Sequence, residues 1–120
     1  MGKILIADDA KFMRMTLTRI IEKTGHEVVG EAITGAEAVE LYREHRPDLV
    51  FMDITMPDMD GISAVRAITK EFPDAKIVMC SALGQQRMVV DAIEAGAKDF
   101  IKKPFEESQI LEVIEKNLDS

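Results

Sequence analysis

The 120-residue sequence has a single cysteine, Cys80, and no apolar run as long as a membrane span. One cysteine excludes an internal disulfide and is typical of a reducing compartment. A membrane-spanning helix needs about 20 consecutive apolar residues. The N-terminal stretch "MGKILIADD" also lacks the long apolar core and the cleavage site of a signal peptide. We therefore expect a cytoplasmic protein with no membrane attachment.

Positive charge is also scarce, because 15 Lys and Arg stand against 22 Asp and Glu for a net charge of −7. Affinity for DNA rests on clustered Lys and Arg that meet phosphates, so nucleic acid is not an expected partner. An acidic chain of this kind suits cations or basic protein surfaces. The sequence also has neither a Walker A loop nor a dinucleotide-binding glycine pattern.

The composition is that of one ordinary soluble globular domain. Hydrophobic residues make up 47% of the chain and charged residues 31%, and this length supports a hydrophobic core without disulfides or metals. No linker, repeat or low-complexity tract interrupts the sequence. We expect one domain over residues 1–120.

Short apolar runs alternate with segments whose apolar residues recur at helical spacing. The runs are Lys3–Asp8, Glu27–Ala32, Asp48–Asp53, Lys76–Ser81 and Ala97–Lys102. The helical segments are Phe12–Thr24, Ala36–His45, Ile62–Phe72, Gln85–Ala95 and Glu106–Leu118. The first, third and fourth runs are almost entirely hydrophobic, which is typical of strands covered on both faces.

A strict alternation of five strands and five helices predicts an α/β fold, a parallel sheet with helices on both faces. The chain is too short for an eight-stranded barrel. In the flavodoxin-like version the strand order is 2-1-3-4-5, and ligands bind outside the carboxyl ends of the strands.

Polar residues gather at those carboxyl ends. Asp8 and Asp9 end the first run, Asp53 ends the third, Ser81 ends the fourth, and Lys103 follows the fifth. In the order 2-1-3-4-5 the first and third strands are adjacent, so the three carboxylates would share one pocket. Two unit charges about 4 Å apart repel by about 4 kcal/mol at an effective dielectric constant near 20, which a divalent cation would relieve.

Mg²⁺ prefers oxygen ligands in octahedral geometry, and the carboxylates, the Thr55 backbone carbonyl and waters would supply them. Lys103 would add a further positive charge, and the Ser81 hydroxyl a hydrogen-bond donor. Such a site handles phosphoryl groups, and a carboxylate oxygen can attack phosphorus to give an aspartyl-phosphate.

Simpler explanations exist for several of these residues. Asp8 and Asp9 could cap the helix that begins near Lys11, because Asp is a favoured N-cap. Asp58 and Asp60 fail the EF-hand spacing and are interpreted as a solvated turn.

Cysteine and methionine side chains are interpreted mainly as core. Cys80 belongs to an apolar run, and Met13 and Met15 belong to the first helical segment. A partner surface is the alternative for the two methionines, because Met adapts to varied contacts.

Four stretches, "ILIADDA", "DLVFMDITMPDMDG", "IVMCSA" and "AGAKDFIKKPF", resemble the signature stretches of response-regulator receiver domains. The resemblance runs the whole length of the chain and implies the flavodoxin-like fold. It is strongest to the stand-alone regulators of chemotaxis within that family.

The resemblance implies a role for each strand-end residue. Asp53 would be the phosphoacceptor, with Mg²⁺ bound by Asp53, by Asp9 and, directly or through water, by Asp8, together with the Thr55 carbonyl. Ser81 would hydrogen-bond the phosphoryl group and Lys103 would pair with it. The Lys103–Pro104 bond is expected to be cis.

The resemblance also implies two switch residues, Ser81 and Phe100. Phe100 stands where the family commonly has Tyr, so contacts through a tyrosine hydroxyl are absent. Thr55 and Leu83 occupy the positions that control how water reaches the phosphoryl group. Because Leu83 offers no polar group to orient water, we expect slow to moderate self-dephosphorylation.

The implied function is that of a monomeric signalling protein, not a turnover enzyme. A sensor histidine kinase would phosphorylate Asp53, and the face of the fourth helix, fifth strand and fifth helix would bind the flagellar motor switch. A phosphatase would reverse the signal. The alternative within the family is a phosphorelay intermediate that passes the phosphoryl group to a histidine phosphotransfer domain.

Two alternatives outside the family are weaker. A haloacid-dehalogenase-type phosphatase needs a second acid two positions after the nucleophile, where this chain has Thr55. A flavodoxin-like electron carrier needs a phosphate-binding loop after the first strand, where "ADDAKF" places acids that would repel a flavin phosphate.

Overall fold

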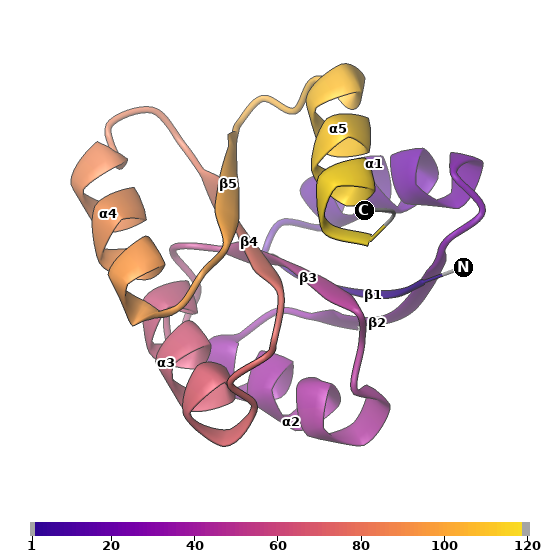
Figure 1. The fold of residues 1–120 in the computed structure, drawn as a ribbon. Helices are drawn as coiled ribbons and strands as arrows, with labels where there is room; N and C mark the ends of the chain where they lie inside the picture. Colours follow the sequence, from indigo (N-terminus) through magenta and orange to yellow (C-terminus); the bar gives the residue numbers. More distant parts are fainter. Residues whose placement is uncertain (1, 119–120) are drawn as a thin grey trace.

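A parallel sheet in the order β2-β1-β3-β4-β5 lies at the centre of the computed structural model, which describes residues 2–118 (Figure 1). The strands are β1 (Lys3–Ala7), β2 (Glu27–Ala32), β3 (Leu49–Asp53), β4 (Ile77–Ser81) and β5 (Asp99–Lys102). The helices are α1 (Lys11–Lys23), α2 (Gly35–His45), α3 (Gly61–Glu71), α4 (Gln86–Ala95) and α5 (Glu107–Leu118). The predicted flavodoxin-like fold is confirmed.

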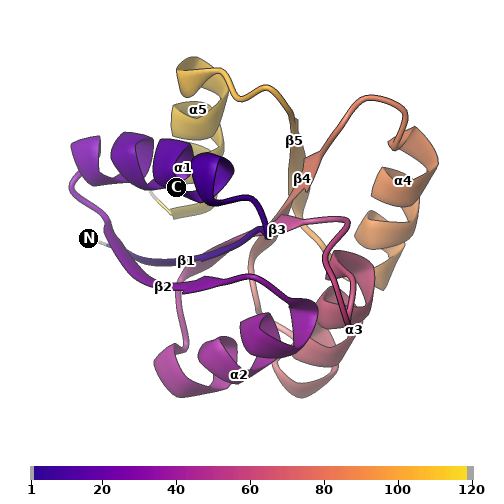
Figure 2. The same ribbon diagram turned by 180° about the vertical axis from the view of Figure 1, so that it is seen from behind.

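Helices cover both faces of the sheet, α1 and α5 on one and α2, α3 and α4 on the other (Figures 1 and 2). Successive strand side chains point to opposite faces. In β1, Ile4 and Ile6 therefore pack in the core under α1 and α5, whereas Leu5 and Ala7 pack in the core on the other side. Within residues 2–118, none of the helices is both long and apolar enough to cross a membrane.

Side-chain caps mark the starts of α2 and α3, and every helix starts one position away from its predicted start. The Thr34 hydroxyl accepts a hydrogen bond from Glu37 N at 3.0 Å, so α2 begins at Gly35. The Asp60 carboxylate accepts from Ser63 N at 2.8 Å and caps α3. Asp60, predicted only as part of a solvated turn, thus satisfies a backbone donor that the first turn of a helix leaves unpaired.

The core assignment of Met15 is wrong, whereas that of Cys80 is confirmed. Cys80 is only 1% exposed and Met15 is 51% exposed. The buried stripe of α1 contains Leu17 and Ile21, and Met15 lies on the opposite side of the helix because adjacent helical residues differ by about 100°. Met13, one turn before Leu17, is half-buried.

Strand register aligns the carboxyl ends of β1, β3, β4 and β5, which carry the polar residues. Ala7 pairs with Met52, Asp53 pairs with Cys80, and Ser81 pairs with Lys102. Residues that immediately follow β1, β4 and β5 therefore lie beside the end of β3. This edge of the sheet carries the candidate site.

The loop between β3 and α3 folds back tightly onto the end of β3. Gly61 N donates to Ile54 O at 2.7 Å, and a Cβ at position 61 would collide with the Asp53 carbonyl oxygen. Only glycine allows this approach of backbone to backbone. Gly61 therefore helps to fix the backbone that carries the Asp53 side chain.

We predict that Gly61→Ala lowers the free energy of unfolding by about 2 kcal/mol or more, because the added methyl group meets backbone that cannot yield. Urea unfolding followed by circular dichroism measures the change. Gly30→Ala is the matched control, since its Cβ would make only ordinary contacts, the nearest at 3.4 Å to a Leu5 methyl. Equal stability of the two variants would contradict the assigned role of Gly61.

Candidate functional site

Three carboxylates converge at the carboxyl ends of β1 and β3. Asp8, Asp9 and Asp53 each offer an oxygen, and these three oxygens lie within 4.8 Å of one another. Asp8 and Asp53 are buried, at 1% and 7% exposed, and Asp9 is exposed. The structure thus brings together the three acids that the strand-end pattern placed in one pocket.

Helix capping does not account for the two acids after β1. The N-cap of α1 is Ala10, and the helix has no side-chain cap hydrogen bond. Asp8 Oδ1 instead accepts from Ala10 N at 2.8 Å, while Asp8 N donates to Ala32 O at 2.9 Å. These two bonds fix Asp8 in the loop and leave its second oxygen directed into the pocket.

Lys103 is the cation that faces the buried pair. Its Nζ lies 2.9 Å from Asp8 Oδ2 and 3.2 Å from Asp53 Oδ1. Lys103 N donates to Ser81 O at 2.7 Å, which holds the residue against the end of β4. The Lys103–Pro104 peptide bond is cis, as expected.

Burial and neighbouring charges shift the pKa values of Asp53 and Lys103. Burial and the neighbouring Asp8 charge raise the pKa of Asp53 to about 6, and Lys103 only partly offsets them. Burial lowers the pKa of Lys103, but the hydrogen bond to Asp8 and the charge of Asp53 outweigh it, so this pKa is raised. Lys103 is therefore a permanent cation that does not fully compensate the acids around it.

The donor set suits a hard divalent cation. Asp8 Oδ2 is fully buried, and Lys103 Nζ, 2.9 Å away, pairs with it. Lys103 shares its single charge between Asp8 and Asp53, so the buried carboxylates keep an excess of negative charge, which is costly in a buried site. Carboxylate oxygens from Asp8, Asp9 and Asp53 are the ligands that Mg²⁺ takes, usually together with waters. The residues present fit such an ion.

Ser81 ends β4, and Thr55 follows the end of β3, the neighbouring strand. Ser81 is 4% exposed, and its hydroxyl donates to Ile101 O over a long 3.5 Å. Thr55, two residues beyond Asp53, is exposed, and its hydroxyl accepts a hydrogen bond from Gln85 Nε2 at 3.0 Å. Sequence reasoning missed Gln85; the only sequence signal was its position at the start of a helix, after the strand that ends in Ser81.

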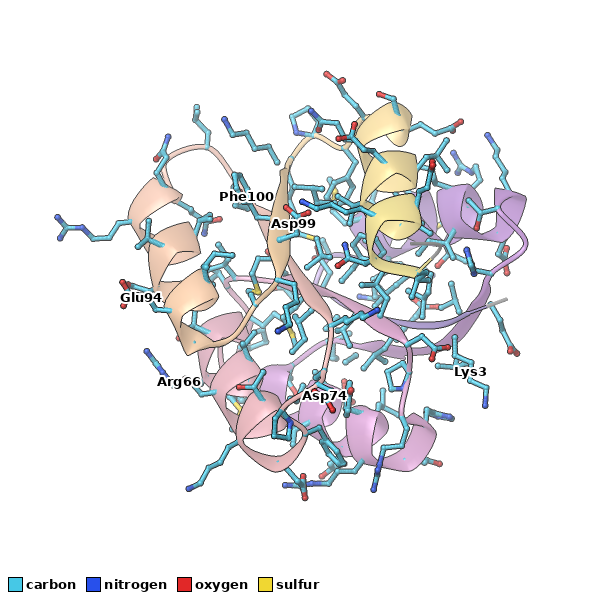
Figure 3. All side chains as sticks on the ribbon, viewed as in Figure 1. Lys3, Arg66, Asp74, Glu94, Asp99 and Phe100 are labelled. Carbon is cyan, nitrogen blue, oxygen red and sulfur yellow. The ribbon has the colours of Figure 1, made fainter. Side chains whose placement is uncertain are left out.

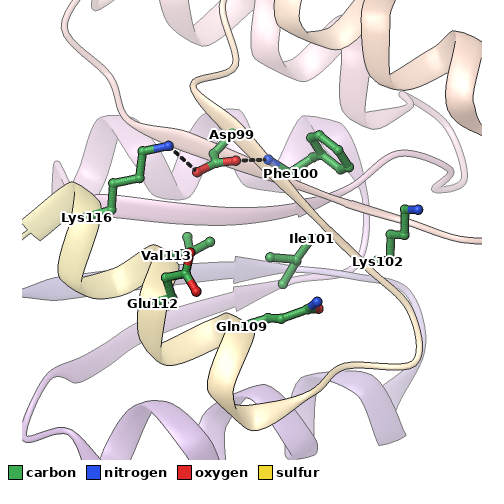
Figure 4. A pocket seen from close by; sticks show the side chains of 8 residues that line it. All are labelled: Asp99, Phe100, Ile101, Lys102, Gln109, Glu112, Val113 and Lys116. Atoms are coloured by element: carbon green, nitrogen blue, oxygen red, sulfur yellow. Dashed lines mark hydrogen bonds and ion pairs between the residues drawn. The ribbon is translucent and has the colours of Figure 1, made fainter.

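Phe100 lies on β5 at the edge of the sheet and is 41% exposed (Figure 3). It lines an apolar groove of about 340 Å³ together with Leu83, Val89 and Val90, and this groove extends to Ser81 and Lys103. On the other side of β5, a second groove of about 380 Å³ separates the strand from α5. There Asp99 pairs with Lys116 at 3.4 Å, and the Phe100 ring points away from α5 (Figure 4).

A model of the response regulator receiver domain family matches residues 4–115, so the chain belongs to this family. The chain is 61% identical over 116 residues to the chemotaxis protein CheY of Bacillus subtilis, covering 97% of each. It is also 61% identical to CheY of Thermotoga maritima over 117 residues, covering 97% of this chain and 98% of that protein. The chain is therefore similar to chemotaxis proteins of the CheY type.

A solved structure of the CheX-CheY-BeF3-Mg²⁺ complex from Borrelia burgdorferi contains a chain that superposes with a TM-score of 0.90. The two sequences are 38% identical, and the match covers 95% of this chain and 87% of that one. The comparison supports both the fold and the family.

We predict that Asp53→Asn stabilises the metal-free protein above pH 6. The native Asp53 pKa of about 6 exceeds the ordinary value of 3.8, so ionising this group costs stability in the folded state. The gain should be about 1 to 2 kcal/mol at pH 7.5 and should shrink as the pH falls from 6 towards 4, where the native carboxyl is protonated.

Urea unfolding in a chelating buffer at several pH values measures this difference. Asp91→Asn, at an exposed position of α4, is the control and should show no such pH-dependent gain. A gain for Asp53→Asn that grows on acidification would contradict the prediction.

Proposed function

We propose that this protein is a chemotaxis response regulator that accepts a phosphoryl group on Asp53 from a CheA-like sensor histidine kinase. The observation that carries the proposal is the position of Lys103 between two buried carboxylates, with its Nζ 2.9 Å from Asp8 and 3.2 Å from Asp53. Membership of the receiver family and the similarity to CheY support it. The phosphoryl group would pass from the kinase to Asp53, because a carboxylate can accept a phosphoryl group and the neighbouring Lys103 cation stabilises the added charge.

In the transfer step an Asp53 carboxylate oxygen forms a bond to phosphorus while the bond from phosphorus to the kinase imidazole nitrogen breaks. Bound Mg²⁺, held by Asp8, Asp9, Asp53 and the Thr55 carbonyl, would neutralise charge on the phosphoryl oxygens. Lys103 Nζ, already 3.2 Å from Asp53 Oδ1, pairs with the added charge. The Ser81 hydroxyl donates a further hydrogen bond to the phosphoryl group.

Phosphorylation would act on the output face through Ser81 and Phe100. Ser81 exchanges its weak bond to Ile101 O, at 3.5 Å, for a stronger charge-assisted one. Ser81, Lys103 and Phe100 line the same groove, so a shift of the first two changes the space open to the ring. The face of α4, β5 and α5 then binds the flagellar motor switch. Moving such an equilibrium from 1:99 to 99:1 needs about 5.5 kcal/mol.

The remaining partners follow from the same proposal. A phosphatase would remove the phosphoryl group, and the CheX named in the similar Borrelia complex is an example of a CheY partner. We expect a monomer, and a single receiver domain over residues 1–120 stays a prediction. No observation favours the alternative of a phosphorelay intermediate.

We predict that beryllofluoride binds the wild-type protein only with Mg²⁺ present and that Asp53→Asn abolishes this binding. Asn cannot supply the carboxylate oxygen that completes the phosphoryl mimic. Calorimetric titration measures the binding, and radiolabelled acetyl phosphate tests covalent labelling. Asp91→Asn should behave as wild type. Labelling that persists in Asp53→Asn would place the phosphoacceptor elsewhere.

We also predict that Leu83→Gln shortens the lifetime of the phosphorylated form about threefold or more. Leu83 is 95% exposed beside the site, and an amide there can orient an attacking water, whereas the leucine cannot. The decay of radiolabelled protein measures the lifetime. Leu111→Gln on α5, 37% exposed, is the control. An unchanged lifetime in Leu83→Gln would show that this position does not govern access of water.

A further inference from the structure

The Gln85 side chain ties together the two loops that flank Asp53. Gln85 Oε1 accepts a hydrogen bond from Ala82 N at 2.6 Å, and Gln85 Nε2 donates one to Thr55 Oγ1 at 3.0 Å. A carboxamide can accept and donate in this way at the same time. Ala82 directly follows Ser81, and Thr55 lies two residues beyond Asp53.

Strand register explains why one side chain can reach both loops. Asp53 pairs with Cys80 in parallel strands, so the chain beyond Asp53 and the chain beyond Cys80 leave the sheet side by side. Ile54 N still donates to Cys80 O, at 3.4 Å. The next contact outward is the one that Gln85 makes between Thr55 and Ala82.

The loop that Gln85 holds has few other restraints. Leu83 is 95% exposed, and Gly84 has a φ of +88°, a conformation that glycine adopts at little cost. Gln85 N donates to Ala82 O at 3.3 Å, and Val89 N donates to Gln85 O at 3.0 Å. Gln85 therefore connects the loop after β4 directly to the first turn of α4.

We propose that Gln85 is a positioning residue that holds the β4–α4 loop in its unphosphorylated arrangement and must release it when Asp53 is phosphorylated. This inference rests on the proposed function. In this proposal the Ser81 hydroxyl leaves Ile101 O and reaches a phosphoryl oxygen on Asp53 by a shift of the β4–α4 loop, which carries Ala82 with it. That movement breaks the 2.6 Å bond between Ala82 N and Gln85, so the two Gln85 bonds oppose activation.

The central experiment compares beryllofluoride affinity at saturating Mg²⁺ for wild type, Gln85→Ala and Gln86→Ala. Gln86 is the matched control because it is the adjacent glutamine and is exposed. It lines the apolar groove that also contains Phe100. Removing the two Gln85 bonds should tighten beryllofluoride binding about three- to tenfold, whereas Gln86→Ala should change it less than twofold. Affinity for Mg²⁺ alone should stay unchanged, since Gln85 contributes no metal ligand.

A double-mutant cycle isolates the Thr55 arm of this contact. Thr55→Val removes the hydroxyl that accepts from Gln85 and keeps the Thr55 backbone carbonyl. If the contact acts as proposed, Thr55→Val alone tightens beryllofluoride binding, and adding it to Gln85→Ala gives little further change. Fully additive effects would overturn the assigned coupling between the two loops.

Hydrogen exchange of the Ala82 amide, measured by NMR in metal-free protein, tests the contact without relying on phosphorylation. The amide should exchange severalfold faster in Gln85→Ala than in wild type or Gln86→Ala. If the wild type fails to bind beryllofluoride, the proposed function is wrong, and this exchange rate alone decides whether the contact holds the loop.

If the wild type binds beryllofluoride and Gln85→Ala binds it equally or more weakly, the inference about Gln85 is overturned while the proposed function stands. Unchanged exchange of the Ala82 amide in Gln85→Ala also overturns the inference.

Discussion

The rest of the site depends on the forced proximity of two buried carboxylates, Asp8 and Asp53. β1 and β3 are adjacent at the centre of the sheet, so residues at their carboxyl ends cannot avoid each other. Burying two like charges together is unfavourable unless cations or hydrogen bonds compensate them. Lys103 provides one positive charge to both, and the negative charge that remains suits a divalent cation among Asp8, Asp9 and Asp53.

The same lysine also links the acids to the groove beside β5, the edge strand of the sheet. Lys103 follows β5, the strand that carries Phe100, and its backbone amide bonds to Ser81 O at 2.7 Å. A change of charge on Asp53 therefore alters the balance of forces on β4 and β5 together. In the proposed function, this short path from the site to the groove would couple the charge on Asp53 to an exposed apolar surface.

Much of the fold was predictable because its signals are local or periodic. The alternation of apolar runs and helical segments gave the five strands, and the continuous hydrophobic runs identified β3 and β4 as buried on both faces. The wrong core assignment of Met15 concerned packing between elements: Met15 has the chemistry of a core residue, but its side chain on α1 is 51% exposed. Asp60 lies in an exposed turn, as predicted, and only its role as the N-cap of α3 was missed.

The sequence by itself determined the kinds of residue at each strand end, because β-strand termini are marked by where apolar runs stop. Only the tertiary structure decided that Lys103 contacts Asp8 as closely as Asp53, that Gly61 packs against the Asp53 backbone, and that Gln85 joins two loops. These contacts connect segments far apart in the chain. The distances in these contacts follow from the order and register of the strands, which bring residues far apart in the chain close together. A local sequence pattern does not specify those distances.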